Sequence, residues 1–426
     1  MTIGIFTFSL LGAMAIGMPI AFALIICGIA LMTHLGIFDS QIIAQNVING
    51  VDSFPLMAVP FFILAGEIMN TGGLARRILN FAIALVGHLR GGLGYVAILT
   101  SCILASLSGS AVADAAALGA LLVPMMVAAG HNRASAAGLV AAGGIIAPVI
   151  PPSIGFVIFG VAAGVSISKL FLAGVVPGLM LGASLCVAWW WVARNENTVS
   201  PPRQSATQIL RALIDGFWAL MLPMIIIVGL RFGIFTPTEA AVVVAVYSFL
   251  VATFIYRELT LSQLVQSLIS SAQITAVVMF LVAAALVSSW LITVADISGQ
   301  IVELARPFMG NQTLLMIVLM IIVVIVGTAL DMTPTILILT PVLMPIVKAA
   351  GIDPVYFGVL FIINNAIGLI TPPVGVVLNV VSGVAKVSMD DIMRGVWPFM
   401  IAQLVVLGLL TLFPSLVLVP PKWLGG

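Results

Sequence analysis

Long runs of hydrophobic residues, separated by short polar connections, occupy almost the whole chain of 426 residues. Many of these runs approach or exceed the roughly 20 residues that an α-helix needs to cross the hydrocarbon core of a bilayer. Only 7% of the residues are charged, whereas soluble domains carry about a quarter. The pattern therefore predicts an all-α polytopic membrane protein that lies in a lipid bilayer.

The polar interruptions of the first half of the chain recur in the second half at a constant distance. Pro124 precedes Pro345 by 221 residues (345 − 124 = 221), and Pro152 precedes Pro373 by the same number (373 − 152 = 221). Internal repeats of this kind are typical of secondary transporters. The expected domains are a first repeat at 1–193, a polar cytoplasmic linker at 194–217 and a second repeat at 218–426.

Each half contains two short apolar segments on either side of a polar tip. The segments lie near 91–129, around Ser106–Ser110, and near 311–349, around Thr328–Thr333. Each segment is short for a full crossing. Non-helical backbone at membrane depth persists only where protein or water satisfies its polar groups. We therefore interpret both pairs as re-entrant helical hairpins that enter and leave the membrane on one side.

A helix interrupted by a Pro-Pro pair follows each hairpin, at 134–165 and at 354–386. Proline has no backbone N–H, so carbonyl groups near the break lose their helical partners. Two tips and two breaks that meet near the midplane are the arrangement expected of a transporter with inverted repeats.

The number of crossings predicts that the second repeat is inverted relative to the first. If the hairpins do not cross, each half has five crossings, an odd number, so the second half starts on the opposite side. Placing the N-terminus outside puts ten of the 15 Lys and Arg residues on the cytoplasmic side, in agreement with the positive-inside rule. The N- and C-termini are then both expected outside.

Polar side chains within the apolar centre are few, and they gather at the tips and breaks. Such residues are costly to bury and mark candidate functional sites. The alternatives are a bond to the preceding helical turn for Ser and Thr, and helix N-capping for the two aspartates. The candidates are Ser106, Ser108, Ser110, Asp114, Ser153, Thr328, Asp331, Thr333, Thr335, Asn364, Asn365, Thr371 and Asn379.

Oxygen-rich tips and breaks favour the chemistry of a hard cation. Na⁺, like other hard cations, prefers carbonyl, hydroxyl and carboxylate oxygens. One tip with one break in each half predicts at least two quasi-equivalent Na⁺ sites. The N-termini of the half-helices beyond the tips would present positive dipole ends to an anionic substrate lying between them.

Other classes of function have weaker support in the sequence. A net charge of about +1 gives no basic face for nucleic acid. The motifs HExxH, GxSxG and GxxxxGK[ST] are absent, so we do not expect an enzyme. An intramembrane enzyme that uses Asp114 and Asp331 and a passive channel are the remaining alternatives of a different class.

Five segments of the chain together form a specific pattern: Ala105–Asp114, Gly143–Ser153, Phe235–Ala240, Asp331–Thr335 and Gly368–Gly375. They resemble the large membrane subunit of tripartite ATP-independent periplasmic (TRAP) transporters, the DctM family of the bacterial inner membrane. The resemblance covers essentially the whole chain, and it is closest to the sugar-acid branch, such as subunits for diketogulonate or sialic acid.

The resemblance implies an elevator mechanism, in which the hairpins and broken helices move as one transport domain against a scaffold of outer helices. It also implies a Na⁺ gradient as the driving force, a periplasmic substrate-binding protein and a small four-helix membrane subunit. Because the chain begins directly at the first span, we expect that small subunit to be a separate chain. A stand-alone Na⁺/carboxylate symporter without a binding protein is the nearest alternative.

The matched motifs also imply which residues form the sites. The candidate substrate residues are Ser108, Ser110 and Asp114, to which we add Ser153 and Asn364 beside the Pro-Pro segments. The residues expected around the first Na⁺ are Ser106, Ala147 and Ile150, and those around the second are Gly327, Thr328, Gly368 and Thr371.

Overall fold

The computed structural model describes residues 2–194, 196, 198 and 201–424. All regular elements in this part of the chain are helical. They are α1 (Thr2–Ala15), α2 (Ile20–Leu35), α3 (Ser40–Val51), η1 (Phe54–Met57), α4 (Ala58–Thr71), α5 (Leu74–Val86), α6 (Gly92–Ser108), α7 (Ala111–Ala128), α8 (Arg133–Gly144), α9 (Ile154–Ala163), α10 (Ile167–Ala193), α11 (Ala206–Arg231), α12 (Pro237–Leu250), η2 (Val251–Ile255), α13 (Leu261–Val294), α14 (Ile297–Ala305), η3 (Arg306–Phe308), α15 (Gln312–Ala329), α16 (Met332–Ala349), α17 (Pro354–Gly368), α18 (Val376–Ala385), α19 (Met389–Leu412) and α20 (Ser415–Leu424).

Nine of the described helical segments are long and apolar enough to cross a membrane. Many large hydrophobic side chains on them remain exposed to the surroundings of the protein. An exposed apolar surface of this extent is stable only in contact with lipid or another membrane protein. The chain is therefore a multi-pass membrane protein, as the sequence predicted.

The bounds of the helices recur at the offset that the sequence showed. α7 and α16 correspond at both ends, because 332 − 111 and 349 − 128 both equal 221. The starts of α8 and α17 obey the same relation (354 − 133 = 221). Both Pro-Pro pairs have a cis peptide bond. The helix bounds and the cis bonds therefore follow the same spacing as the interruptions in the sequence.

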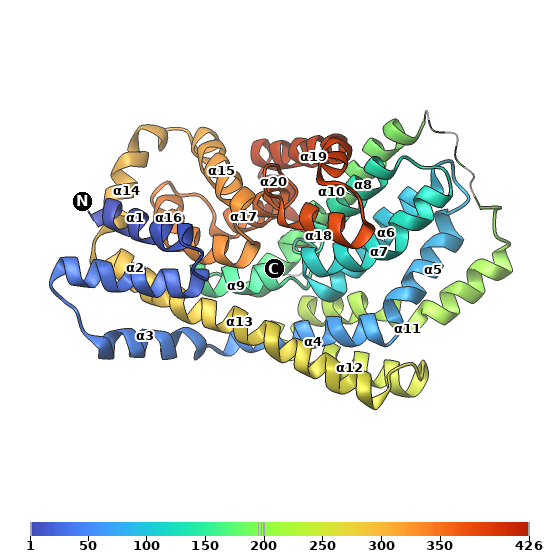
Figure 1. The fold of residues 1–426 in the computed structure, drawn as a ribbon, viewed down its shortest axis with the longest axis horizontal. Coiled ribbons are helices and arrows are strands. Elements are labelled where there is room, and N and C mark those ends of the chain that lie inside the picture. The colour runs from blue at the N-terminus through green and yellow to red at the C-terminus, as the bar shows by residue number, and fades with distance from the viewer. Residues whose placement is uncertain (1, 195, 197, 199–200, 425–426) are drawn as a thin grey trace.

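The long helix α13 organises one layer of the molecule. It packs against α2, α3 and α4, while α12 packs against α4 and α11 packs against α5. Figure 1 shows α3, α13, α4 and α12 following one long edge of the molecule. We call the helices α1–α5 and α11–α13 the outer layer.

The hairpins and broken helices, with α10 and α19, pack against one another beside the outer layer. α8 contacts α7 and α19, α15 contacts α17, and α16 contacts α9 across the two halves. The crossing of α8 and α19 is close, since a Cβ atom on Gly138 would lie 2.5 Å from the carbonyl carbon of Gly395. We call the group formed by α6–α10 and α15–α19 the core layer.

Two features of the outer layer differ from the expectation. The amphipathic segment at 40–51 forms α3, which the search for apolar runs did not reveal, and α13 runs unbroken from Leu261 to Val294. At the repeat offset, α3 and α4 together correspond to α13 (261 − 40 = 221). Pro55 lies in η1, between α3 and α4. Its counterpart is Ala276 (55 + 221 = 276), so the helix continues in the second half.

The segment 194–217, which the sequence predicted to be a linker, contains the start of a helix. α11 already begins at Ala206, where Ser205 and Gln208 form a capping box. The Ser205 hydroxyl accepts from the Gln208 N–H at 3.3 Å, and the Gln208 side chain accepts from the Ser205 N–H at 2.8 Å. This reciprocal capping stabilises a polar helix start, which a search for apolar runs overlooks.

Candidate functional site

The first hairpin tip lies directly on the first Pro-Pro break. α6 ends at Ser108, and Gly109 then adopts a left-handed conformation with φ of +61°. A Cβ atom on Gly109 would lie 2.9 Å from the Pro152 carbonyl oxygen and 3.0 Å from the Ile154 nitrogen. Only glycine combines this φ with so close an approach of two backbones.

Asp114 projects back from α7 to the end of α6. One carboxylate oxygen, Oδ1, accepts a hydrogen bond from the Ser108 hydroxyl. The other, Oδ2, has no hydrogen-bond partner in the described part of the chain, although Asp114 is only 4% exposed. Ser110, and not Asp114, caps α7, because its hydroxyl accepts from the Ala113 N–H at 3.4 Å. Capping therefore does not account for this carboxylate.

The second hairpin tip is less tightly bonded than the first. Asp331 occupies the N-cap position of α16 but makes no capping hydrogen bond with its side chain. The hydroxyl of Thr335 donates to the Asp331 carbonyl at 2.8 Å, and that of Thr328 donates to the Ile325 carbonyl at 2.8 Å. The Asp331 side chain is exposed, although the sequence placed it among the buried polar residues, and it can face a cavity.

Both tips and both breaks meet at a cavity of about 260 Å³, which we call the tip cavity. The first residues of four helices, α7, α9, α16 and α18, contribute to its wall. This meeting of tips and breaks is the one that the sequence predicted. The lining residues are Ile63, Gly109, Ser110, Ala111, Val112, Ile154, Gly155, Ile274, Val278, Asp331, Met332, Thr333, Leu369 and Val376.

A second cavity of about 550 Å³ adjoins the tip cavity and extends to the start of α2. The two cavities share Val278, Asp331 and Thr333. Asp331 therefore lies where one cavity passes into the other. The sequence marked Asp331 and Thr333 as buried polar residues, but the matched motifs did not place either of them among the candidate substrate residues.

The candidate substrate residues fall into two groups. Ser110 lines the tip cavity, and Ser108 and Asp114 lie beside it through the hydrogen bonds of the tip. Ser153 does not line it, because its hydroxyl donates to the Pro148 carbonyl and accepts from the Phe156 N–H at 3.1 Å. Asn364 also lies elsewhere: its amide donates to the Met320 carbonyl in α15.

The candidate residues for the first Na⁺ bring carbonyl groups to the first tip and break. Ala147 and Ile150 lie between α8 and α9, and their carbonyl oxygens accept no backbone hydrogen bond from the described residues. The Ser106 hydroxyl donates to the Ile103 carbonyl at 2.6 Å, so it retains lone pairs. Oxygens of this kind fit a hard cation.

The candidate residues for the second Na⁺ occupy the equivalent positions. Gly327, Gly368 and Thr371 follow Ser106, Ala147 and Ile150 by 221 residues each (327 − 106 = 368 − 147 = 371 − 150 = 221). A Cβ atom on Gly368 would lie 2.7 Å from the Gly327 carbonyl carbon, so the second tip and break touch. The Thr371 hydroxyl donates to the Ile367 carbonyl at 2.7 Å. Thr328 adjoins Gly327 at the end of α15.

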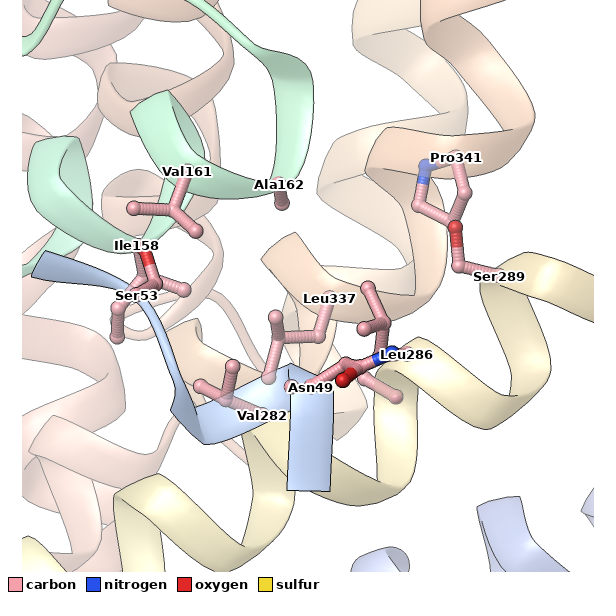
Figure 2. A pocket seen from close by; sticks show the side chains of 12 residues that line it. Asn49, Ser53, Ile158, Val161, Ala162, Val282, Leu286, Ser289, Leu337 and Pro341 are labelled. Carbon is pink, nitrogen blue, oxygen red and sulfur yellow. The ribbon is translucent and has the colours of Figure 1, made fainter. Parts of the chain in front are cut away.

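A further cavity of about 250 Å³ lies between the outer layer and the core layer. Figure 2 shows the outer-layer residues of this cavity: Asn49 on α3, Ser53 just after α3, and Val282, Leu286 and Ser289 on α13. They face residues of α9 and α16. The core-layer residues are Ile158, Val161, Ala162, Leu337 and Pro341. The boundary between the layers is thus mostly apolar and incompletely filled here.

Comparisons with known proteins agree on one family. A profile described as "Tripartite ATP-independent periplasmic transporter, DctM component" matches residues 7–416. The chain is 56% identical to the 2,3-diketo-L-gulonate TRAP transporter large permease protein of Escherichia coli, over 100% of both chains. It is 37% identical to the sialic acid TRAP transporter large permease protein of Vibrio cholerae, over 97% of both.

Two further matches add range to this similarity. The C4-dicarboxylate TRAP transporter large permease protein of Pseudomonas aeruginosa is 39% identical over 90% of both chains. Among solved structures, the YdaH transporter of Alcanivorax borkumensis aligns with a TM-score of 0.64 at 13% identity, covering 90% of this chain and 89% of that one. At so low an identity the structural match shows a common fold.

Proposed function

This chain belongs to the DctM family of large permeases of tripartite ATP-independent periplasmic transporters, and we propose that it imports an organic acid together with Na⁺. The observation that carries this proposal is the tip cavity, where two hairpin tips and two broken helices converge. We place the chain in the bacterial inner membrane, with both termini on the periplasmic side.

The tip cavity suits an anion although no Lys or Arg side chain lines it. Four helix N-termini face it, and each carries roughly half a positive charge from the aligned peptide dipoles. Free N–H groups at such termini bind carboxylates directly. Ser110 and Thr333 add hydroxyl groups, which suit the hydroxyls of a sugar acid.

Two cation sites beside the cavity would couple the anion to Na⁺. Carbonyl and hydroxyl oxygens at the tips and breaks would provide the ligands, with Ser106, Ala147 and Ile150 around one ion and Gly327, Thr328, Gly368 and Thr371 around the other. The Gly368 carbonyl already accepts from the Thr371 N–H at 3.0 Å, so it would bind the ion through its second lone pair. Asp114 and Asp331 lie close to the cavity and are negative when ionised. Na⁺ bound nearby would offset their repulsion of an anionic substrate, because opposite charges attract strongly in a medium of low dielectric constant.

The two layers of the fold support movement of an elevator type. Ile63, Ile274 and Val278 of the outer layer form one wall of the tip cavity, and the core layer forms the rest. The cavity shown in Figure 2 lies at the same boundary. An apolar boundary with few polar contacts allows one layer to slide past the other, carrying substrate and ions with the core layer.

The relatives indicate the substrate class and the partners. We propose a sugar acid, since the Escherichia coli relative for 2,3-diketo-L-gulonate is 56% identical along the full chain. Sialic acid and C4-dicarboxylates, named for relatives at 37% and 39% identity, are the other compounds to test. We further propose a periplasmic binding protein and a small four-helix membrane subunit as partners.

The experiment is uptake into proteoliposomes that contain this chain and its small membrane subunit. Binding protein loaded with labelled 2,3-diketogulonate, sialic acid or succinate is added outside, under a Na⁺ or a K⁺ gradient. We expect uptake of a sugar acid only when both the binding protein and the Na⁺ gradient are present. Equal uptake without the binding protein would indicate a stand-alone symporter, and equal uptake in K⁺ would contradict Na⁺ coupling.

A further inference from the structure

Asn365 has a buried amide oxygen that nothing in the described part of the chain satisfies. The residue lies in the last turn of α17 and is 0% exposed. Its Nδ2 donates to the Met332 carbonyl at 3.2 Å, which fixes the orientation of the amide. Its Oδ1 has no hydrogen-bond partner. An unsatisfied buried acceptor costs about 1–3 kcal/mol, so an oxygen kept in this state calls for a specific role.

The unsatisfied oxygen points to the place where the second tip touches the second break. A Cβ atom on Gly327 would lie 2.8 Å from Asn365 Oδ1, and one on Gly368 would lie 2.9 Å from the Gly327 carbonyl oxygen. The Gly327 Cα–H therefore lies near Oδ1, and a C–H group is only a weak donor. The Gly327 carbonyl itself accepts no backbone hydrogen bond from the described residues outside the helices.

We infer that Asn365 Oδ1 is a further ligand of the second cation site and strengthens its hold on Na⁺. This inference rests on the Na⁺ coupling proposed above and adds a residue that the matched motifs did not indicate. A neutral amide oxygen is a suitable ligand for a hard monovalent cation. The bond from Nδ2 to Met332 keeps the oxygen aimed at the site before the ion arrives.

The inference also makes the two cation sites unequal. The repeat equivalent of Asn365 is Gly144 (365 − 221 = 144), which has no side chain. A Cβ atom on Gly144 would lie 2.6 Å from the Ala115 Cβ and 3.1 Å from the Ala111 carbonyl oxygen. Helix α7 therefore occupies the corresponding space in the first half. The first site lacks this ligand, so the second site binds Na⁺ more tightly than the first.

The test compares Asn365→Leu with Asn365→Asp in the full chain, held in lipid nanodiscs. The melting temperature is followed as NaCl replaces KCl at constant ionic strength, and its midpoint gives the apparent Na⁺ affinity. Leu removes the oxygen, and we expect at least about a tenfold loss of affinity, the scale on which ligand-shell changes act. Asp keeps an oxygen at this position, and we expect it to retain the wild-type affinity or to exceed it.

The two variants separate a ligand role from a structural one, because both lose the Asn amide that donates to Met332. Equal Na⁺ responses in both variants would overturn the inference. Asn364→Leu is the matched control: it removes the neighbouring buried amide, and we expect a lower melting temperature with an unchanged Na⁺ midpoint. If Asn365→Leu does not fold, Asn365→Ala gives the same comparison.

The same data separate this inference from the proposed coupling. A wild-type melting temperature that is equal in NaCl and KCl would contradict Na⁺ coupling and the inference together. A wild-type Na⁺ response that Asn365→Leu retains in full would overturn the inference alone.

Discussion

The hydroxyl of Ser108 donates a hydrogen bond to Asp114 across the first hairpin tip, and this bond holds a nearly buried carboxylate beside the tip cavity. Ser108 is itself anchored, since it accepts from the Ser110 N–H at 3.2 Å. The second carboxylate oxygen of Asp114 is left without a partner in the described residues. The tip thus positions a buried carboxyl group that has one oxygen bonded and one oxygen without a hydrogen-bond partner.

Replacing this carboxylate is expected to stop transport without unfolding the protein. Asp114→Asn keeps the size of the side chain and removes its charge, so the buried tip gains no cavity. We expect uptake to fall by at least about 100-fold, the scale of about 3 kcal/mol in differential binding, with an unchanged melting temperature in KCl. The control is Asp390→Asn, which removes an exposed carboxylate at the start of α19. This variant should transport normally.

Gly109 is expected to tolerate no side chain. In Gly109→Ala the left-handed backbone costs about 1–2 kcal/mol, and the new Cβ would lie 2.9 Å from the Pro152 carbonyl oxygen. Both stability and uptake should fall. Gly164→Ala is the matched control, because its φ is +66° but nothing lies within 4 Å of the added Cβ. It should show the backbone cost alone, with uptake retained; equal loss of uptake in both variants would contradict the role of the tip contact.

Backbone oxygens, and not the Thr371 hydroxyl, are expected to hold the second Na⁺. Thr371→Val removes a hydroxyl that already donates to Ile367, so the Na⁺-dependent rise in melting temperature should persist with only a modest loss of affinity. In Gly368→Ala the added Cβ would push against Gly327, and the rise should disappear.

Gly383→Ala on α18 is the control for Gly368→Ala, since nothing lies within 4 Å of its Cβ. Alanine favours a helix by about 1 kcal/mol over glycine, so this variant should be as stable as the wild type or more so. A Na⁺ response lost in Thr371→Val but retained in Gly368→Ala would reverse the assignment.

Arg77 is expected to hold the outer layer together. Its guanidinium lies 2.7 Å from a Glu258 carboxylate oxygen, 3.5 Å from one of Asp215 and 3.7 Å from the centre of the Tyr256 ring. Arg77→Ala should lower the stability by about 2 kcal/mol, because the guanidinium is itself only 15% exposed and loses both its contact with the Tyr256 ring and its packing. The control is Arg306→Ala. Its ion pair with Glu303 is 74% and 67% exposed, and removing such a pair should change stability by less than about 1 kcal/mol.

The sequence predicted the elements around the site because their signals are local. Pro151-Pro152 and the cluster Ser106–Ser110 interrupt apolar runs, and the structure ends helices at both. The outer layer was less predictable. The apolar residues of α3 lie on one face and form no long apolar run, so a search for membrane spans overlooks this helix. The capping box at Ser205 lies inside the segment that was predicted to be a linker.

Side-chain direction accounts for the remaining differences at the site. Asn364 and Asn365 are neighbours of the same type, yet Asn364 bonds to α15 while the oxygen of Asn365 is unsatisfied. The Ser153 hydroxyl caps the N-terminus of α9 and does not line the tip cavity. Which side chain faces a cavity depends on how α17 and α9 are rotated against their neighbours, and that rotation is set by tertiary packing.

The central claim is that two hairpins enter the membrane from opposite sides and meet at the tip cavity. Arg90 and Ala128 flank the first hairpin, and their repeat equivalents Asn311 and Ala349 flank the second (90 + 221 = 311; 128 + 221 = 349); all four are exposed. Each is changed to Cys in a chain whose three native cysteines are replaced.

The direct measurement is labelling of these four cysteines with a membrane-impermeant thiol reagent in right-side-out and inside-out vesicles. We predict that positions 90 and 128 react only from the cytoplasmic side and that 311 and 349 react only from the periplasmic side. Reaction of 90 and 128 from opposite sides, or of all four from one side, would contradict the account.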